Sequence, residues 1–286
     1  MTTSPSPNVQ QRTLRNVILF SVIVLVSGWL GYWLDRTMQN PPDRQLGKLL
    51  WLVLPLLTAL VLRAFAGDGW KDFGLALALK GNGRWYVVSV LLYPVVTALG
   101  LALSGAFGLV TFSNFSMPLV FSAFVAGLAP SFFKNIFEEF AWRGYLAPKV
   151  RILVDNDVLG YLIVGVVWGC WHIPYILFYL GAAEIQAATA QNITTFLPIG
   201  ILNLVVASIA YNEMRFLTGS VWTAVLMHTV CNALTEMLAV QGFISIKAGK
   251  GVWVSPGHNS ILTLILFLVV GIGLRHARRK KESLAA

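Results

Sequence analysis

Apolar residues along the chain gather into eight segments, each about 15–23 residues long, separated by short polar stretches. The segments are Leu14–Leu34, Leu49–Gly67, Trp85–Gly105, Pro118–Phe137, Val158–Leu180, Ile193–Tyr211, Ser220–Val240 and Ser260–Leu274. A helix of about 20 apolar residues spans a bilayer core, and shorter or longer segments differ in tilt. A transmembrane strand instead needs about ten residues of alternating hydrophobicity, and these segments do not alternate. The pattern predicts an all-α polytopic membrane protein with about eight transmembrane helices.

Composition agrees with a membrane protein and excludes several other classes. Hydrophobic residues make up 57% of the chain and charged residues 12%, against roughly 25% charged residues in an average soluble domain. These values exclude a disordered chain, a coiled coil and a soluble nucleic-acid-binding protein, whose surface has to be richly charged. We expect no nucleic-acid partner. We divide the chain into a disordered cytoplasmic tail at 1–13, a single transmembrane helical domain at 14–275 and a basic cytoplasmic tail at 276–286.

The positive charges predict the orientation in the membrane. With the N-terminus in the cytoplasm, 15 of the 21 Lys and Arg residues fall on the cytoplasmic side, five fall outside and Lys134 lies within a segment. The five outside residues are Arg36, Arg44, Lys48, Lys247 and Lys250. The positive-inside rule therefore places both termini in the cytoplasm, where the basic run from Arg275 to Lys281 can contact anionic headgroups of the lipid bilayer. Short loops and the lack of a targeting motif favour a bacterial plasma membrane.

The first group of polar residues within a predicted span is Glu138, Glu139 and Arg143. Charged groups at membrane depth are costly and are candidates for function by default. Adjacent residues on a helix point about 100° apart, so Glu138 and Glu139 face different directions. Glu139 and Arg143 are spaced i, i+4 in the favourable order, which predicts an ion pair and leaves Glu138 free for chemistry. The alternative is that both carboxylates pair with Lys134 and Arg143 and hold helices together.

Two further pairs of polar or aromatic residues share a helix face. Trp168 and His172 are spaced i, i+4, and the following Pro174 removes a helix hydrogen bond, which favours a small polar cavity beside the histidine. His228 and Asn232 are again i, i+4. The alternative is that these side chains only form hydrogen bonds between packed helices.

Depth links the three groups. Counted from the cytoplasmic ends of their segments, Glu138, His228 and His172 lie roughly 13 Å, 15 Å and 16–21 Å into the membrane. A buried carboxylate such as Glu138 can act as general base toward water, while histidines and an amide orient that water or stabilise an oxyanion. Glu138, His172 and His228 can instead bind a divalent metal such as zinc, with water in the fourth position. Both options predict hydrolysis of an acyl or peptide bond.

These motifs resemble those of the CPBP family (CAAX prenyl protease and bacteriocin-processing, also called Abi), which are largely helical intramembrane proteases. Glu138, Glu139 and Arg143 match the family's Glu-Glu-x-x-x-Arg motif, and His228 and Asn232 match its His-x-x-x-Asn motif. His172 matches Phe-x-x-x-His, with Trp168 in place of the usual Phe. The resemblance covers a core at about 118–240.

The resemblance implies roles for these residues in an intramembrane endopeptidase. Glu138 would activate water, His172 and His228 would position it and Asn232 would support the oxyanion, while Glu139, Arg143 and Trp168 would maintain the geometry. The partner would be a membrane-embedded or membrane-associated peptide or protein. The family was first described as metal-dependent, yet its motifs carry no recognised zinc signature. A non-catalytic bacteriocin-immunity or membrane scaffold protein is the alternative, and a transporter, which would show repeated halves, is a more distant one.

Overall fold

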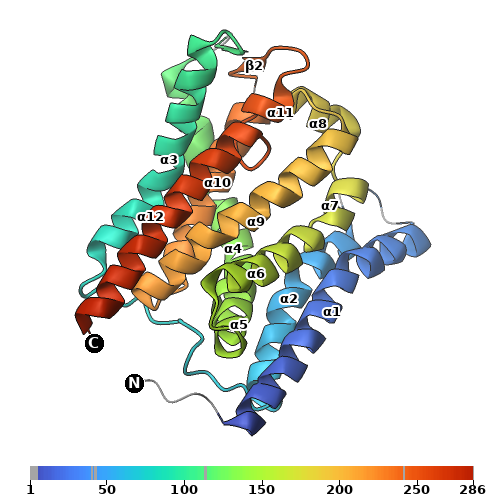
Figure 1. The fold of residues 1–286 in the computed structure, drawn as a ribbon. Helices are drawn as coiled ribbons and strands as arrows, with labels where there is room; N and C mark the ends of the chain where they lie inside the picture. The colour runs from blue at the N-terminus through green and yellow to red at the C-terminus, as the bar shows by residue number, and fades with distance from the viewer. Residues whose placement is uncertain (1–5, 40, 42–43, 113–114, 241, 286) are drawn as a thin grey trace.

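The computed structural model describes residues 6–39, 41, 44–112, 115–240 and 242–285, and these are nearly all helical (Figure 1). In chain order the elements are α1 (Pro7–Met38), α2 (Leu46–Phe65), α3 (Gly83–Ala106), β1 (Val110–Thr111), α4 (Met117–Ala141), the π-helix η1 (Trp142–Leu146), α5 (Ala147–Leu153), α6 (Asp157–Trp171), α7 (Ile173–Phe178), α8 (Ala182–Thr189), α9 (Ile193–Thr218), α10 (Trp222–Val240), β2 (Ser245–Ile246), α11 (Gly251–Val254) and α12 (Ile261–Ala285). The two short strands pair antiparallel, with Val110 opposite Ile246. The prediction of an all-α protein is confirmed.

Seven helical stretches of the described chain are long and apolar enough to cross a membrane. They are Pro7–Met38, Leu46–Phe65, Gly83–Ala106, Met117–Leu153, Asp157–Phe178, Ile193–Thr218 and Ile261–Leu284. The remaining predicted segment forms α10, which is not among the seven. The protein is an integral membrane protein, and the count of eight spans stays a prediction.

The first and last helices extend beyond the predicted domain boundaries. α1 begins at Pro7, so residues 7–13 of the predicted tail are helical; proline suits this first position because its fixed φ is already helical and its missing N–H is not needed. Residues 1–5 lie outside the described part. α12 continues through Ala285, and its basic residues pair with acidic residues on other helices, which holds this end of the helix in place.

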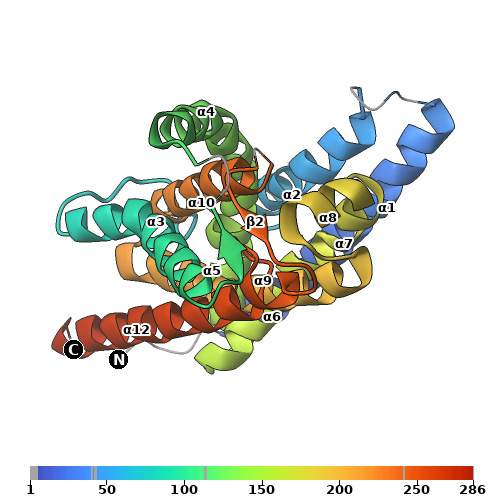
Figure 2. The same cartoon turned by 90° about the horizontal axis from the view of Figure 1, so that it is seen from above.

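The helices form one bundle in which α9 and α10 lie between two groups. α1 and α2 are on one side, and α3 and α12 are on the other (Figures 1 and 2). The main packing partners are α1 with α2, α4 with α10, and α9 with both α6 and α12. α1 and α2 approach through Gly31 and Gly47, where a β-carbon built on Gly47 would lie 1.8 Å from the Gly31 carbonyl oxygen. Only glycine permits this contact between backbones, as is common between membrane helices.

The loop between α2 and α3 supports the junction of α4, η1 and α5. The Asp72 carboxylate lies 2.6 Å from Arg63 and 3.0 Å from Lys149. Burial opposes ionisation of Asp72, but these two cations outweigh it and hold the pKa of the carboxyl below its ordinary value. Arg63 also donates a 2.6 Å hydrogen bond to the carbonyl of Gly144 within η1. A π-helix breaks the regular i, i+4 ladder and is often found beside functional sites.

α1 begins and α12 ends at the same end of the bundle (Figure 1), which fits termini on one side of the membrane. The uneven distribution of Lys and Arg leads us to expect that this side is the cytoplasm. Ser283→Cys, made with Cys170 and Cys231 replaced by alanine, is expected to resist an impermeant maleimide in intact cells and to react after lysis. A cysteine at Lys247 is the opposite control and should react in intact cells. Labelling of position 283 from outside would contradict the predicted orientation.

Candidate active site

Glu138 lies near the end of α4 with a nearly fully buried side chain. Its Oε1 is 3.5 Å from the Nζ atom of Lys134, one helical turn earlier, and its Oε2 accepts a 3.4 Å hydrogen bond from Trp168 Nε1 on α6. Glu138 thus pairs with Lys134, as in the alternative in which both carboxylates hold helices together, and its freedom for chemistry stays a prediction. Lys134 is four residues away on the same face, which brings the ammonium next to the carboxylate.

Glu139 takes part in two buried interactions through one oxygen. Its Oε1 is 3.2 Å from Arg143 Nη1 and 2.8 Å from His228 Nδ1 on α10. The predicted ion pair with Arg143 is confirmed, and both of its side chains are fully buried. The Arg143 guanidinium lies against the rings of Trp168 and Tyr211, with its Cζ at 4.1 and 4.5 Å from their centroids. Cation–π contacts on aromatic faces fix the plane of the arginine and hence the position of Glu139.

Both histidines have a hydrogen bond that sets their tautomer. His172 lies at the junction of α6 and α7, and its Nδ1 is 2.9 Å from the carbonyl oxygen of Trp168. A carbonyl can only accept, so Nδ1 of His172 carries the proton. The carboxylate of Glu139 fixes His228 in the same way. In each neutral ring, Nε2 is left as the basic nitrogen, which can accept a proton or bind water.

Trp168 brings the predicted residues together. Its ring makes edge contacts with His172 and His228 at centroid distances of 6.0 and 5.8 Å, and its Nε1 donates to Glu138. The Glu138 charge also interacts electrostatically with both histidines. Glu138, His172 and His228 thus share one site, although His228 forms its hydrogen bond with Glu139 rather than with Glu138. Their depth in the bilayer stays a prediction.

Asn232 lies one turn beyond His228 on α10, and its Nδ2 donates a 3.2 Å hydrogen bond to Oδ1 of Asn135 on α4. Asn135 is fully buried, and its Nδ2 has no hydrogen-bond partner among the described residues. An unpartnered buried amide is costly and indicates a place for a polar group. Sequence reasoning missed Asn135, although it is a polar residue three positions before Glu138 within the same predicted span.

A cavity of about 200 Å³ reaches Lys134 and Asn232. Most of its other lining residues come from α8, the start of α9 and the loop before α12, including Glu184, Phe196 and Asn259. These elements lie at the end of the bundle opposite the last turns of α12 (Figure 1). The cavity therefore extends from that end of the bundle to Lys134, one helical turn before Glu138, and to Asn232, one turn after His228.

The alternative of a bound zinc ion requires the side chains of Glu138, His172 and His228 to point toward one common position. Within the described chain, no group of three or more His, Cys, Asp or Glu side chains is arranged to hold a metal ion. The Glu138 oxygens contact an ammonium and an indole N–H, and both compete with a metal for the carboxylate. The residues as arranged do not fit a zinc site, and no step below is assigned to a metal.

Sequence reasoning also missed Tyr211 of α9, which is fully buried, contacts Arg143 and His228, and shares a 2.9 Å hydrogen bond with Tyr93 of α3. Aromatic residues are common in apolar segments, so Tyr211 carries no signal in the sequence. Its place beside the site follows from the packing of α9 against η1 and α10.

Residues 121–234 match the family model described as type II CAAX prenyl endopeptidase Rce1-like. The match covers 114 of the 286 residues and includes every predicted site residue from Glu138 to Asn232. No curated protein matches the chain.

Proposed function

We propose, on the basis of the match of residues 121–234 to the Rce1-like family model of type II CAAX prenyl endopeptidases, that the chain hydrolyses a peptide bond of a membrane-associated substrate at Glu138. The observation that carries the proposal is the shared environment of one buried carboxylate and two histidines around Trp168. Each of these histidines presents Nε2 as a base.

In the proposed reaction, Glu138 accepts a proton from a water molecule as the water oxygen forms a bond to the substrate carbonyl carbon. The carbonyl oxygen becomes an oxyanion, which the amide N–H groups of Asn232 and Asn135 are suited to stabilise. The carbon–nitrogen bond then breaks, and the leaving amine takes the proton back from Glu138. Nε2 of His172 or of His228 accepts the other hydrogen of the water and so orients it, and Glu139 and Arg143 hold His228 in its tautomer.

The test of the function is a comparison of membrane peptidomes from cells that carry the wild type or Glu138→Ala. The expected result is that a set of cleaved termini disappears in the variant while the protein remains abundant in the membrane. Glu184→Ala is the matched control, because Glu184 is an exposed carboxylate at the rim of the cavity. Cleavage products that survive in Glu138→Ala would contradict the proposal.

Asn232→Ala is expected to reduce kcat by about 10²-fold, the scale for the loss of one oxyanion donor. The variant loses the N–H contact to the developing charge and the hydrogen bond to Asn135, while Glu138 and both histidines remain. Steady-state kinetics in detergent would measure the effect, with KM expected to change little. A large rise in KM at unchanged kcat would instead assign Asn232 to substrate binding.

Chelation separates the general-base mechanism from metal catalysis. Because the three residues do not fit a zinc site, activity of the purified protein is expected to survive extended treatment with EDTA. Metal analysis of the active protein is expected to give much less than one zinc per chain. Loss of activity on chelation with recovery on addition of zinc would contradict the expectation.

One observation favours the non-catalytic alternative of a scaffold or immunity protein. Glu138 pairs with Lys134 and Glu139 pairs with Arg143, which is the arrangement expected if both carboxylates only hold helices together. Such a protein needs the ion pairs and not the basic Nε2 atoms. It would retain its cellular function in His172→Ala and in His228→Ala, whereas a protease would lose it in both.

A further inference from the structure

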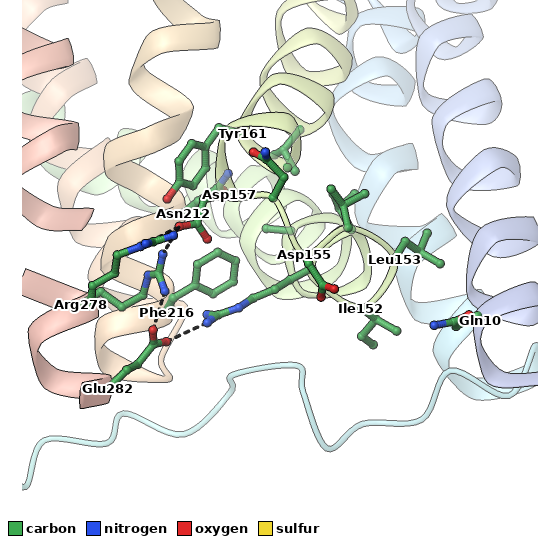
Figure 3. Close-up of a pocket in the computed structure, with 18 residues that line it drawn as sticks. Gln10, Ile152, Leu153, Asp155, Asp157, Tyr161, Asn212, Phe216, Arg278 and Glu282 are labelled. Carbon is green, nitrogen blue, oxygen red and sulfur yellow. Dashed lines mark hydrogen bonds and ion pairs between the residues drawn. The ribbon is translucent and has the colours of Figure 1, made fainter. Parts of the chain in front are cut away.

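A second cavity, of about 730 Å³, lies between α5, α6, α9 and α12, at the end of the bundle where α12 ends (Figure 3). It shares no lining residue with the cavity beside Glu138. Its volume is within the range of about 300–1,000 Å³ that is usual for sites of small ligands. The proposed protease reaction does not use it.

One wall of this cavity is a cluster of ion pairs that attaches α12 to its neighbours. Asp157 Oδ2 lies 2.9 Å from each of the three arginines Arg275, Arg278 and Arg279. Arg278 also pairs with Glu213 at 2.6 Å and with Glu282 at 2.7 Å, so its guanidinium group contacts three carboxylates. The three arginines thus face three carboxylates, those of Asp157, Glu213 and Glu282, so the formal charges balance and only N–H donors that these carboxylates leave unused can bind a further anion.

Two arginines that line the cavity keep unused hydrogen-bond donors. Arg279 is 60% exposed and, within the part of the chain that the structure describes, donates through Nε and Nη2 to Asp157 alone. Arg151 donates through Nη2 to Glu282 and lies 4.5 Å from the centroid of the Phe216 ring, which fixes its orientation. A guanidinium carries five N–H donors in a planar fork that matches the oxygens of a phosphate. Both side chains can therefore bind an anion without losing their present partners.

Asn212 on α9 supplies a different kind of contact. It lines the cavity (Figure 3), is 1% exposed, and its Oδ1 accepts no hydrogen bond from any described residue. A buried acceptor without a donor is costly, so the site indicates a ligand with a hydroxyl or other donor group. Asp155, also in the lining, offers a second acceptor.

The position of the cavity identifies the source of such a ligand. It lies where three predicted membrane spans, α6, α9 and α12, reach the end of the bundle, which is the level of lipid headgroups. Beside the lining residues of α6, the apolar side chains of Val158, Leu159 and Leu162 are about half exposed, as expected for a face that contacts acyl chains. Arginines that lie between helices at this level commonly bind anionic headgroups.

We propose that this cavity binds the headgroup of an anionic phospholipid that carries free hydroxyl groups, of which phosphatidylglycerol is the simplest. The phosphodiester contacts Arg151 and Arg279, and a headgroup hydroxyl donates to Oδ1 of Asn212. The bound lipid joins α12 to α5, α6 and α9 at the end of the bundle where the ion-pair cluster lies.

Thermal stability of the purified full-length protein in detergent tests the ligand. Phosphatidylglycerol is expected to raise the unfolding temperature most, because a ligand that binds only the folded state stabilises it. Phosphatidylmethanol has the same charged phosphodiester without hydroxyls and is expected to act less, and phosphatidylcholine and inorganic phosphate least. Equal stabilisation by inorganic phosphate would overturn the assignment to a lipid, and equal stabilisation by phosphatidylmethanol would overturn the role of the hydroxyl.

Two variants on one helix locate the effect. Arg279→Gln is expected to weaken phosphatidylglycerol binding by about tenfold, the change for one charge-assisted hydrogen bond. Lys280→Gln removes the same charge from the adjacent exposed residue, which does not line the cavity, and is expected to leave binding unchanged. Equal losses in both would show general attraction to basic residues and overturn the site. Asn212→Leu should abolish the preference for phosphatidylglycerol over phosphatidylmethanol. A preference that persists in the folded variant would overturn the proposed site. Arg279 is exposed, so the Arg279→Gln variant decides the test even if Asn212→Leu does not fold.

Discussion

Glu138→Gln is expected to lower kcat for peptide cleavage by about 10²–10⁴-fold and to leave the protein folded. Glutamine keeps the shape of the side chain and its hydrogen bond from Trp168, but its amide cannot accept the proton of water. The effect should be on kcat with KM nearly unchanged, because the loss occurs only in the transition state. The measurement is cleavage by the purified protein, with Glu184→Gln as the matched control.

The histidines extend this prediction from one residue to a site. His172→Ala and His228→Ala should each abolish most cleavage, and the triple variant with Glu138→Gln should be little worse than Glu138→Gln alone. Residues that act as one unit fail together, so their effects on the activation free energy do not add. Additive losses would mean that the three residues act independently, and retained cleavage in folded Glu138→Gln would favour the scaffold alternative.

Glu139→Gln is expected to destabilise the protein by about 3–5 kcal/mol, much more than Glu138→Gln, because it leaves a buried charge unpaired. Arg143 is fully buried and pairs with Glu139, and the same carboxylate oxygen also holds His228. In contrast, the partner of Glu138 is Lys134, whose side chain is 39% exposed and can turn to solvent or headgroups. Thermal unfolding in detergent should show a difference between the two variants on the order of 10 °C.

A double variant separates loss of charge balance from loss of packing. Arg143→Met combined with Glu139→Gln removes both buried charges and is expected to recover a large part of the stability lost in Glu139→Gln alone. Its activity should stay low, because His228 has lost the carboxylate that fixes its tautomer. Equal stability of the single variants Glu138→Gln and Glu139→Gln would contradict the division of roles between the two carboxylates.

Local spacing in the sequence is sufficient for the features that depend on one helix. Apolar segment lengths predict the helices, because a helix in lipid satisfies its own backbone hydrogen bonds without regard to the rest of the chain. The i, i+4 rule predicts the pair of Glu139 with Arg143. The same rule applies equally to Lys134 and Glu138, which also form an ion pair. The match to the Rce1-like family agrees with the three motifs, which are also local patterns.

Only the tertiary structure decides which residues from different helices meet. The contact of His228 with Glu139 joins positions 89 residues apart, and the indole of Trp168 reaches Glu138 from 30 residues away. Asn135, Tyr211 and the cavity walls gain their roles in the same way. Apolar spans can pack in many rotations with similar burial, because lipid tails are as apolar as the helix surfaces, so the hydrophobic pattern alone does not select one arrangement. The sequence therefore predicts charged and histidine side chains within apolar helices, and the packing of α4, α6 and α10 determines that Glu138, His172 and His228 surround Trp168.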